Sequence, residues 1–205
     1  MVLDTLAVSW LAMRGEFERA TEAALHLQAT GEKMGLSQQD DAVAGAQLSI
    51  QLWRGEYDGL LAMLRSMRDD EVLPLDSGLL ALLVRAGHLE EARALRAEVD
   101  IELGGDTWFS LLPWALGAES ALALGDRDLA AATYALLAPH AGEMACAGSG
   151  SAFGPVDAFL AMAAAATGEA DLAARHASDA LELCREWRLP LVAEWFDDQR
   201  DRYGF

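Results

Sequence analysis

A glycine-centred motif recurs five times along this chain. The copies begin at Gly15, Gly55, Gly87, Gly125 and Gly168 and read GEFERA, GEYDGL, GHLEEA, GDRDLA and GEADLA, with 32 to 43 residues between successive glycines. A period in this range is typical of repeats built from paired helices, in which each pair buries its apolar face against the next pair. The motif therefore predicts a stacked helical array before any chemistry is considered.

The residues around each glycine predict the turn of a helical hairpin. A glycine just past a helix end can adopt the left-handed conformation that closes the helix, and the acidic residues that follow suit the positive end of the next helix. A small residue five positions after four of the glycines allows the two helices to approach closely, and Leu60 replaces it in the second copy. We expect helix pairs at 3–14 with 16–34, 39–54 with 57–68, 76–86 with 89–102, 107–124 with 127–141 and 155–167 with 170–187, then a last helix at 191–203.

Composition favours an all-α fold. Hydrophobic residues make up 53% of the 205 residues, Asn is absent and only 5 prolines occur, a mixture that suits helices and disfavours tight β-turns. We expect a single domain over 1–205. The Gly/Ser-rich segment 142–154 is the one candidate for a flexible loop, and the alternative is that packing against a neighbouring helix orders it.

The charge of the chain excludes some classes of partner. Its formal net charge is −18 and Lys33 is its only lysine, so it lacks the basic stripe that binds nucleic-acid backbones. The acidity predicts a soluble surface, and the alternative is a surface that attracts a basic protein. The apolar run 159–166 is too short to span a bilayer, and Asp4 without early basic residues argues against a secretory signal. We expect a cytoplasmic protein that binds neither membrane nor nucleic acid directly.

The repeated motif resembles the tetratricopeptide repeat (TPR), which has Gly, an acidic residue, an aromatic residue, and Ala five positions after the Gly. Phe17 and Tyr57 supply the aromatic in the first two copies, whereas Leu89, Arg127 and Ala170 replace it in the others. The resemblance implies a right-handed superhelix (α-solenoid) of about five helical hairpins plus a C-terminal capping helix. It also implies a non-catalytic role in protein–protein interaction, with no cofactor.

A narrower resemblance covers residues 154–190. The order of its residues is similar to the end of the helical-repeat region in large bacterial signalling ATPases that feed LuxR-type transcriptional regulators; the matching residues are Gly154, Pro155, Val156, Gly168, Ala180, Leu181, Leu189 and Pro190. This resemblance implies a sensory module that is part of, or related to, such a regulator. ATPase activity does not carry over, because the chain has no GxxxxGK[ST] phosphate loop.

Four residues near the ends of first helices are candidates for partner binding. Arg14 and Arg54 precede a repeat glycine directly, Arg85 lies two residues before one, and Trp53 adjoins Arg54. One explanation is that a cation in the last turn offsets the negative helix end, worth a few tenths to about 1 kcal/mol. The other is an arginine ladder on the inner face, with Trp53 as an apolar anchor, that clasps a protein or peptide partner. The first helix pair also leaves an apolar end that could self-associate.

Two further functions remain as alternatives. The string DDQRD places Asp197, Asp198 and Asp201 in the pattern of the aspartate-rich magnesium motif of all-α terpene and prenyl synthases, which would make the chain a magnesium-dependent enzyme. A solvated carboxylate cluster on a terminal helix explains this string better, because a magnesium site needs converging oxygen ligands. The other alternative is a groove between first helices that senses a small molecule.

Histidine and cysteine give no clear metal or catalytic site. His26, His88 and His140 have no second His or Cys one helical turn away, and His176 lies eight residues from Cys184. Those two residues do not complete a zinc shell, and we expect a semi-exposed ring and a buried thiol instead. With Cys146, the chain has two cysteines, and we expect free thiols and no disulfide. No catalytic residue and no metal ligand is predicted.

Overall fold

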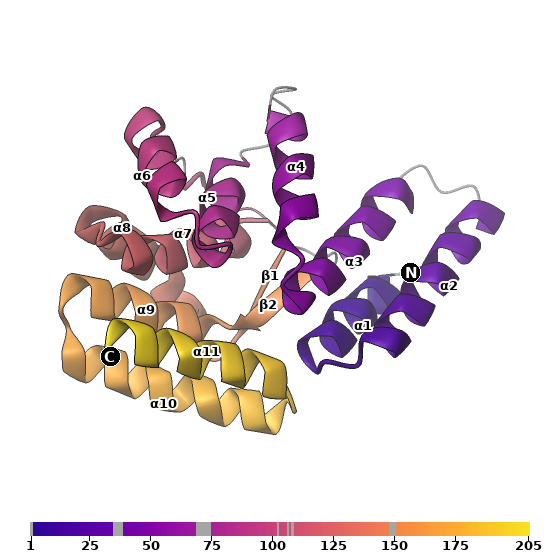
Figure 1. The fold of residues 1–205 in the computed structure, drawn as a ribbon. Helices are drawn as coiled ribbons and strands as arrows, with labels where there is room; N and C mark the ends of the chain where they lie inside the picture. Colours follow the sequence, from indigo (N-terminus) through magenta and orange to yellow (C-terminus); the bar gives the residue numbers. More distant parts are fainter. Residues whose placement is uncertain are drawn as a thin grey trace.

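The computed structural model describes residues 2–34, 39–68, 75–101, 103–105, 107, 109–147 and 151–205. These residues form eleven α-helices, one short 3-10 helix and a two-stranded sheet, so the protein is mostly helical, as predicted. The helices are α1 (Val2–Met13), α2 (Phe17–Met34), α3 (Gln39–Arg54), α4 (Tyr57–Arg68), α5 (Asp76–Arg85), α6 (Leu89–Glu98), α7 (Leu111–Leu124), α8 (Arg127–Leu137), α9 (Val156–Thr167), α10 (Ala170–Glu186) and α11 (Pro190–Tyr203) (Figure 1). None of the described helices is long and apolar enough to cross a membrane.

The five expected helix pairs are present, in chain order. The second pair begins and ends at the predicted residues, whereas α6 and α8 each end four residues before the predicted end. The two helices of each pair pack together, and each second helix also packs against the first helix that follows it, α2 on α3, α4 on α5, α6 on α7, α8 on α9 and α10 on α11. Successive pairs are therefore joined side by side along the chain (Figure 1).

The repeat glycines have the backbone conformation that their position predicts. Their φ angles lie between +70° and +88°, in the left-handed region that closes a helix end. The small residues that follow are fully buried, with 0% exposure at Ala20, Ala92, Ala130 and Ala173, and Leu60 in the same position is 1% exposed. The motif thus encodes both the turn and the close contact between the helices of a pair.

The described residues of the predicted flexible loop, 142–147 and 151–154, are ordered by packing, and residues 148–150 of that loop lie outside the described residues. Strands β1 (Met144–Ala147) and β2 (Ser151–Pro155) pair in antiparallel register, with Met144 opposite Pro155. All five residues of β2 are buried, because β2 packs against α1, α3 and α10 while β1 packs against α7. The Ser151 hydroxyl also donates to the carbonyl of Gly45 at 3.2 Å. Tertiary packing orders the two strands, which agrees with the alternative to a flexible loop, whereas the local composition did not indicate that they are strands.

The hairpin also joins the two ends of the helical array. It lies between the first two helix pairs and the helices α9 to α11 (Figure 1). Helix α1 contacts α11 directly, and the ring of Trp10 lies 6.3 Å from that of Trp187 between centroids. The apolar residues Val8, Ala12 and Met13 of α1 are fully buried by these contacts and by α2 and α3.

Candidate functional site

A chain of polar side chains connects α8, α9 and α10, and it begins at Asp157 in the first turn of α9. This residue is the only charged one in α9, and its side chain is 3% exposed. Its Oδ2 accepts a hydrogen bond of 2.7 Å from the backbone N–H of Gly142, in the turn before β1. The Val156 N–H donates to the Glu143 carbonyl at 2.9 Å, so the turn and the start of α9 are held together.

His176 on α10 continues the polar chain. Its Nδ1 lies 2.8 Å from Asp157 Oδ1, and its Nε2 lies 3.1 Å from the hydroxyl of Tyr134 on α8. The small, buried residues Ala173 and Ala177 bring α10 close to α9, which places the imidazole beside the carboxylate. The His176 side chain is only 14% exposed. Both of its ring nitrogens therefore contact protein atoms in an environment from which water is largely excluded. We refer to Asp157, His176 and Tyr134 as the polar triad.

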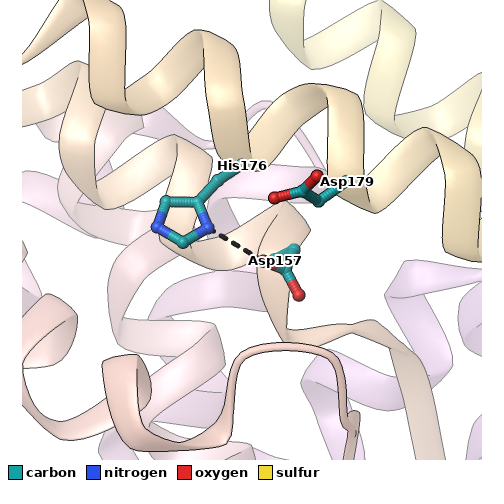
Figure 2. A group of neighbouring side chains, drawn as sticks. All are labelled: Asp157, His176 and Asp179. Carbon is teal, nitrogen blue, oxygen red and sulfur yellow. Dashed lines mark hydrogen bonds and ion pairs between the residues drawn. The ribbon is translucent and has the colours of Figure 1, made fainter.

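Asp179 lies beside the polar triad, one helical turn after His176 on the same face of α10. Its carboxylate is directed toward the Asp157–His176 pair, as Figure 2 shows. One potential ligand atom from each of Asp157, His176 and Asp179 lies within 4.8 Å of the others. Asp179 is exposed whereas Asp157 is buried, so this three-residue group opens to solvent on one side.

A second polar group lies inside the helical core. The guanidinium of Arg85 on α5 makes two hydrogen bonds of 2.8 Å to the carboxylate of Glu119 on α7. The side chains are only 4% and 1% exposed. The Arg85 guanidinium carbon also lies 4.6 Å from the ring centroid of Trp195 and 5.6 Å from that of Trp53. A bidentate, buried pair between two aromatic rings connects four helices and is not available at the surface.

The candidate partner-binding residues therefore divide into two groups. Trp53 is 7% exposed and Arg85 is buried, so neither presents a surface to a partner in this structure. Arg14 and Arg54 are partly exposed, at 32% and 35% of their side chains. The Nε of Arg14 lies 2.9 Å from Glu16, and the Arg54 guanidinium lies over the ring of Phe17, 5.0 Å from its centroid.

Arg14 and Arg54 lie where the turns of the first two helix pairs come together. Glu56 contributes a carboxylate 4.0 Å from Arg54. A shallow hollow of about 430 Å³ adjoins this region and is lined by Gln51, Gly55, Glu56, Tyr57, Asp58, Gly59 and Ala86. We call Arg14, Glu16, Phe17, Arg54 and the lining of this hollow the turn edge.

The aspartates of the DDQRD string are not assembled as a ligand set among the residues that the structure describes. They lie on α11, where Asp197 accepts a hydrogen bond from Arg200 at 3.3 Å and Asp198 and Asp201 are exposed. The group of three potential ligands found in the described part of the chain is instead Asp157, His176 and Asp179. The carboxylates of DDQRD are thus solvated on a terminal helix.

The two cysteines are free thiols. Burial raises the pKa of Cys184 to about 12, and the negative charge of Asp197 adds to this effect. Burial also raises the pKa of Cys146, with a further contribution from Glu143. Both thiols are therefore protonated at neutral pH, which makes them poor nucleophiles.

Sequence reasoning missed Tyr134, Asp157 and Asp179 because it compared each histidine only with other histidines and cysteines. The one-turn spacing of His176 and Asp179 is a ligand pattern that a search including carboxylates would have found. It also missed Glu119. A single charge within an otherwise apolar helix, as at Asp157 and Glu119, indicates a buried partner, because an unpaired charge is too costly to bury.

Comparisons with protein-family models, with curated proteins and with solved structures find no match to this chain. Its function is therefore inferred from its own residues and contacts.

Proposed function

We propose that this chain is a non-catalytic, TPR-like helical-repeat module that binds a protein or peptide partner. The observation that carries this proposal is the packing order, in which each second helix contacts both its own first helix and the first helix of the next unit. Stacking of this kind produces a long surface made of equivalent positions, and such surfaces are commonly used to bind other proteins.

The turn edge is the part of this surface that we assign to the partner. It combines Phe17 and Tyr57 with charges of both signs, and aromatic and arginine side chains are the residue types that contribute most to protein interfaces. Its carboxylates Glu16, Glu56 and Asp58 and the net charge of −18 favour a partner with basic residues. The surfaces of α1, α3 and α7 that contact the strands β1 and β2 are less suitable, because the chain's own strands already cover them.

A relationship to bacterial transcriptional or signalling regulators is part of this proposal and rests on the residue order at 154–190. In the fold this segment covers the end of β2, all of α9 and α10, and the start of α11. In a regulator, such a module would transmit partner binding to an output domain, and the module itself would have no catalytic role.

Affinity capture with matched variants tests the proposal. The full chain is immobilised and exposed to native extract, and captured proteins are identified by mass spectrometry. Arg14→Glu and Arg54→Glu are compared with Arg175→Glu, which reverses an exposed charge on α10 away from the turn edge. We expect a saturable partner whose capture falls roughly tenfold or more in the turn-edge variants, as at an interface hot spot, and is unchanged in the control. If all variants keep their helicity and capture the partner equally well, the turn edge is not the binding surface.

A small-molecule sensor is the alternative that the same protein preparation can test. A second hollow of about 370 Å³ lies between α4 and α6 over the side chains Leu79 and Leu83, and Glu91 and Glu98 are at its margin. A thermal-shift screen of metabolites tests this alternative. A concentration-dependent rise in melting temperature would favour it, provided that affinity capture finds no protein partner.

A further inference from the structure

We infer that Asp157, His176 and Asp179 form a binding site for a divalent first-row transition-metal ion, with Zn²⁺ as its representative. The three side chains supply one nitrogen and two oxygens, a mixture that zinc accepts. They come from two helices that pack closely, and the ligand atoms lie within 4.8 Å of one another. Ligands on a tetrahedral zinc ion lie about 3.4 Å apart, so binding requires the Asp157 and His176 ligand atoms to separate slightly from 2.8 Å and the exposed Asp179 side chain to rotate toward them.

The buried ligands are already held by hydrogen bonds outside the site. Asp157 Oδ2 accepts from the Gly142 N–H, which leaves Oδ1 directed at His176. On the far side of the imidazole, Nε2 contacts the Tyr134 hydroxyl. Metal-binding histidines and carboxylates typically have such outer partners, because these set the ring orientation and the tautomer. The Gly142 N–H and the Tyr134 hydroxyl therefore give the site an outer layer of support.

The Tyr134 hydroxyl suits both the metal-free and the metal-bound site, because a hydroxyl both donates and accepts hydrogen bonds. Without metal, Nδ1 lies at hydrogen-bond distance from Asp157 Oδ1, and Nε2 lies at hydrogen-bond distance from the Tyr134 hydroxyl, which is able to donate to this nitrogen or to accept from it. When the ion binds Nδ1, the imidazole proton resides on Nε2 and is donated to the Tyr134 oxygen. The contact between Tyr134 and His176 is kept in both states.

The donor set favours transition metals over magnesium and calcium. Mg²⁺ and Ca²⁺ prefer oxygen ligands in sets of six or more, and imidazole is a poor ligand for both. Two carboxylates and one imidazole satisfy three positions of a zinc site, and the exposed side at Asp179 leaves room for water as a further ligand. This site is independent of the turn edge, so it does not depend on the proposed partner.

Calorimetric titration of the full chain with zinc chloride, after treatment with a chelator, tests the inference. We expect one zinc ion per chain and no comparable heat with magnesium chloride. Asp179→Ala removes the exposed ligand without disturbing the hydrogen bonds of Asp157 or His176, and we expect it to weaken binding at least as much as the roughly 10–100-fold that loss of an outer partner causes. Asp198→Ala removes an exposed carboxylate from α11 and is the matched control, with unchanged affinity expected.

Tyr134→Phe tests the positioning of His176 separately from folding. We expect this variant to weaken zinc binding roughly 10-fold while the far-UV circular dichroism spectrum is unchanged. Cobalt(II) substitution gives a spectroscopic readout: visible bands of a low-coordinate site without a thiolate charge-transfer band are expected, which excludes Cys146 and Cys184 as ligands. Absence of one-to-one binding, equal affinity in Asp179→Ala and the parent chain, or a thiolate band would each overturn the inference.

Discussion

The carboxylate of Glu119 accepts hydrogen bonds from both Nε and Nη2 of Arg85, each at 2.8 Å, inside the helical core. The two residues are 34 positions apart in sequence and belong to different helix pairs. Because both side chains are almost fully buried, neither can exchange its partner for water. The pair therefore couples the third and fourth helix pairs more specifically than apolar packing alone.

Removing one member of this pair is expected to destabilise the protein strongly. Glu119→Gln leaves the buried Arg85 charge without its counter-charge, and we expect a loss of about 3–5 kcal/mol in the free energy of unfolding measured with urea. The double variant Arg85→Met with Glu119→Leu should recover most of this loss, because it removes both charges. Glu91→Gln breaks the exposed pair with Arg65 and should cost less than about 1 kcal/mol. Similar losses of unfolding free energy in Glu119→Gln and Glu91→Gln would contradict the expected difference between a buried and an exposed ion pair.

Gly154 in β2 is expected to tolerate substitution poorly. Its φ is +116°, and a Cβ at this position would lie 2.7 Å from Cγ1 of Val192 on α11. Gly154→Ala therefore adds a steric conflict, about 1–3 kcal/mol, to the backbone strain. Gly15→Ala is the control, because its φ of +75° imposes strain while nothing lies within 4 Å of the added atom. Thermal unfolding should show a larger loss for Gly154→Ala, and equal losses would mean that α11 shifts to relieve the conflict.

The stability of the protein is expected to fall at alkaline pH because of Cys184. Its pKa is raised to about 12 in the folded protein from an ordinary value of 9.0, so the folded state holds the proton more tightly than the unfolded state. The contribution of the protonated Cys184 thiol to the free energy of unfolding is complete below pH 9. It is lost as the pH rises from 9 toward 12, with a slope of at most about 1.4 kcal/mol per pH unit. Urea unfolding of the parent chain and of Cys184→Ala between pH 7 and 10.5 checks this, and parallel pH profiles would refute it.

Asp126 carries two separable interactions at the start of α8. Its Oδ1 accepts from the Leu129 N–H at 3.0 Å, and its Oδ2 pairs with Arg96 Nε at 2.8 Å. Asp126→Ala removes the helix cap and the ion pair, and we expect it to cost about 1–2 kcal/mol. Asp126→Asn keeps an acceptor for Leu129, so it should lose less than about 1 kcal/mol. Chemical denaturation of both variants checks this. Equal losses of unfolding free energy would mean that the ion pair with Arg96, and not the helix cap, carries the stabilisation.

The repeat determined the helical pairing. Gly55 and Tyr57 mark the turn of the second pair, and its bounds could be predicted to the residue because the glycine conformation and the helix start are local properties. The buried alanines that follow the glycines report contacts within one pair, which are also short in sequence. Such features depend on neighbours that the sequence places next to one another.

The tertiary structure decided which polar residues meet. Arg85 and Trp53 had the sequence signature of a helix end near a binding surface, yet they are buried because α7 and α11 pack over them with Glu119 and Trp195. Asp157 and His176 come together because α9 and α10 pack closely through small side chains, and Tyr134 arrives from a third helix. The order of helices follows from local sequence, whereas these clusters depend on which helices pack against one another and bring side chains that are distant in sequence into contact.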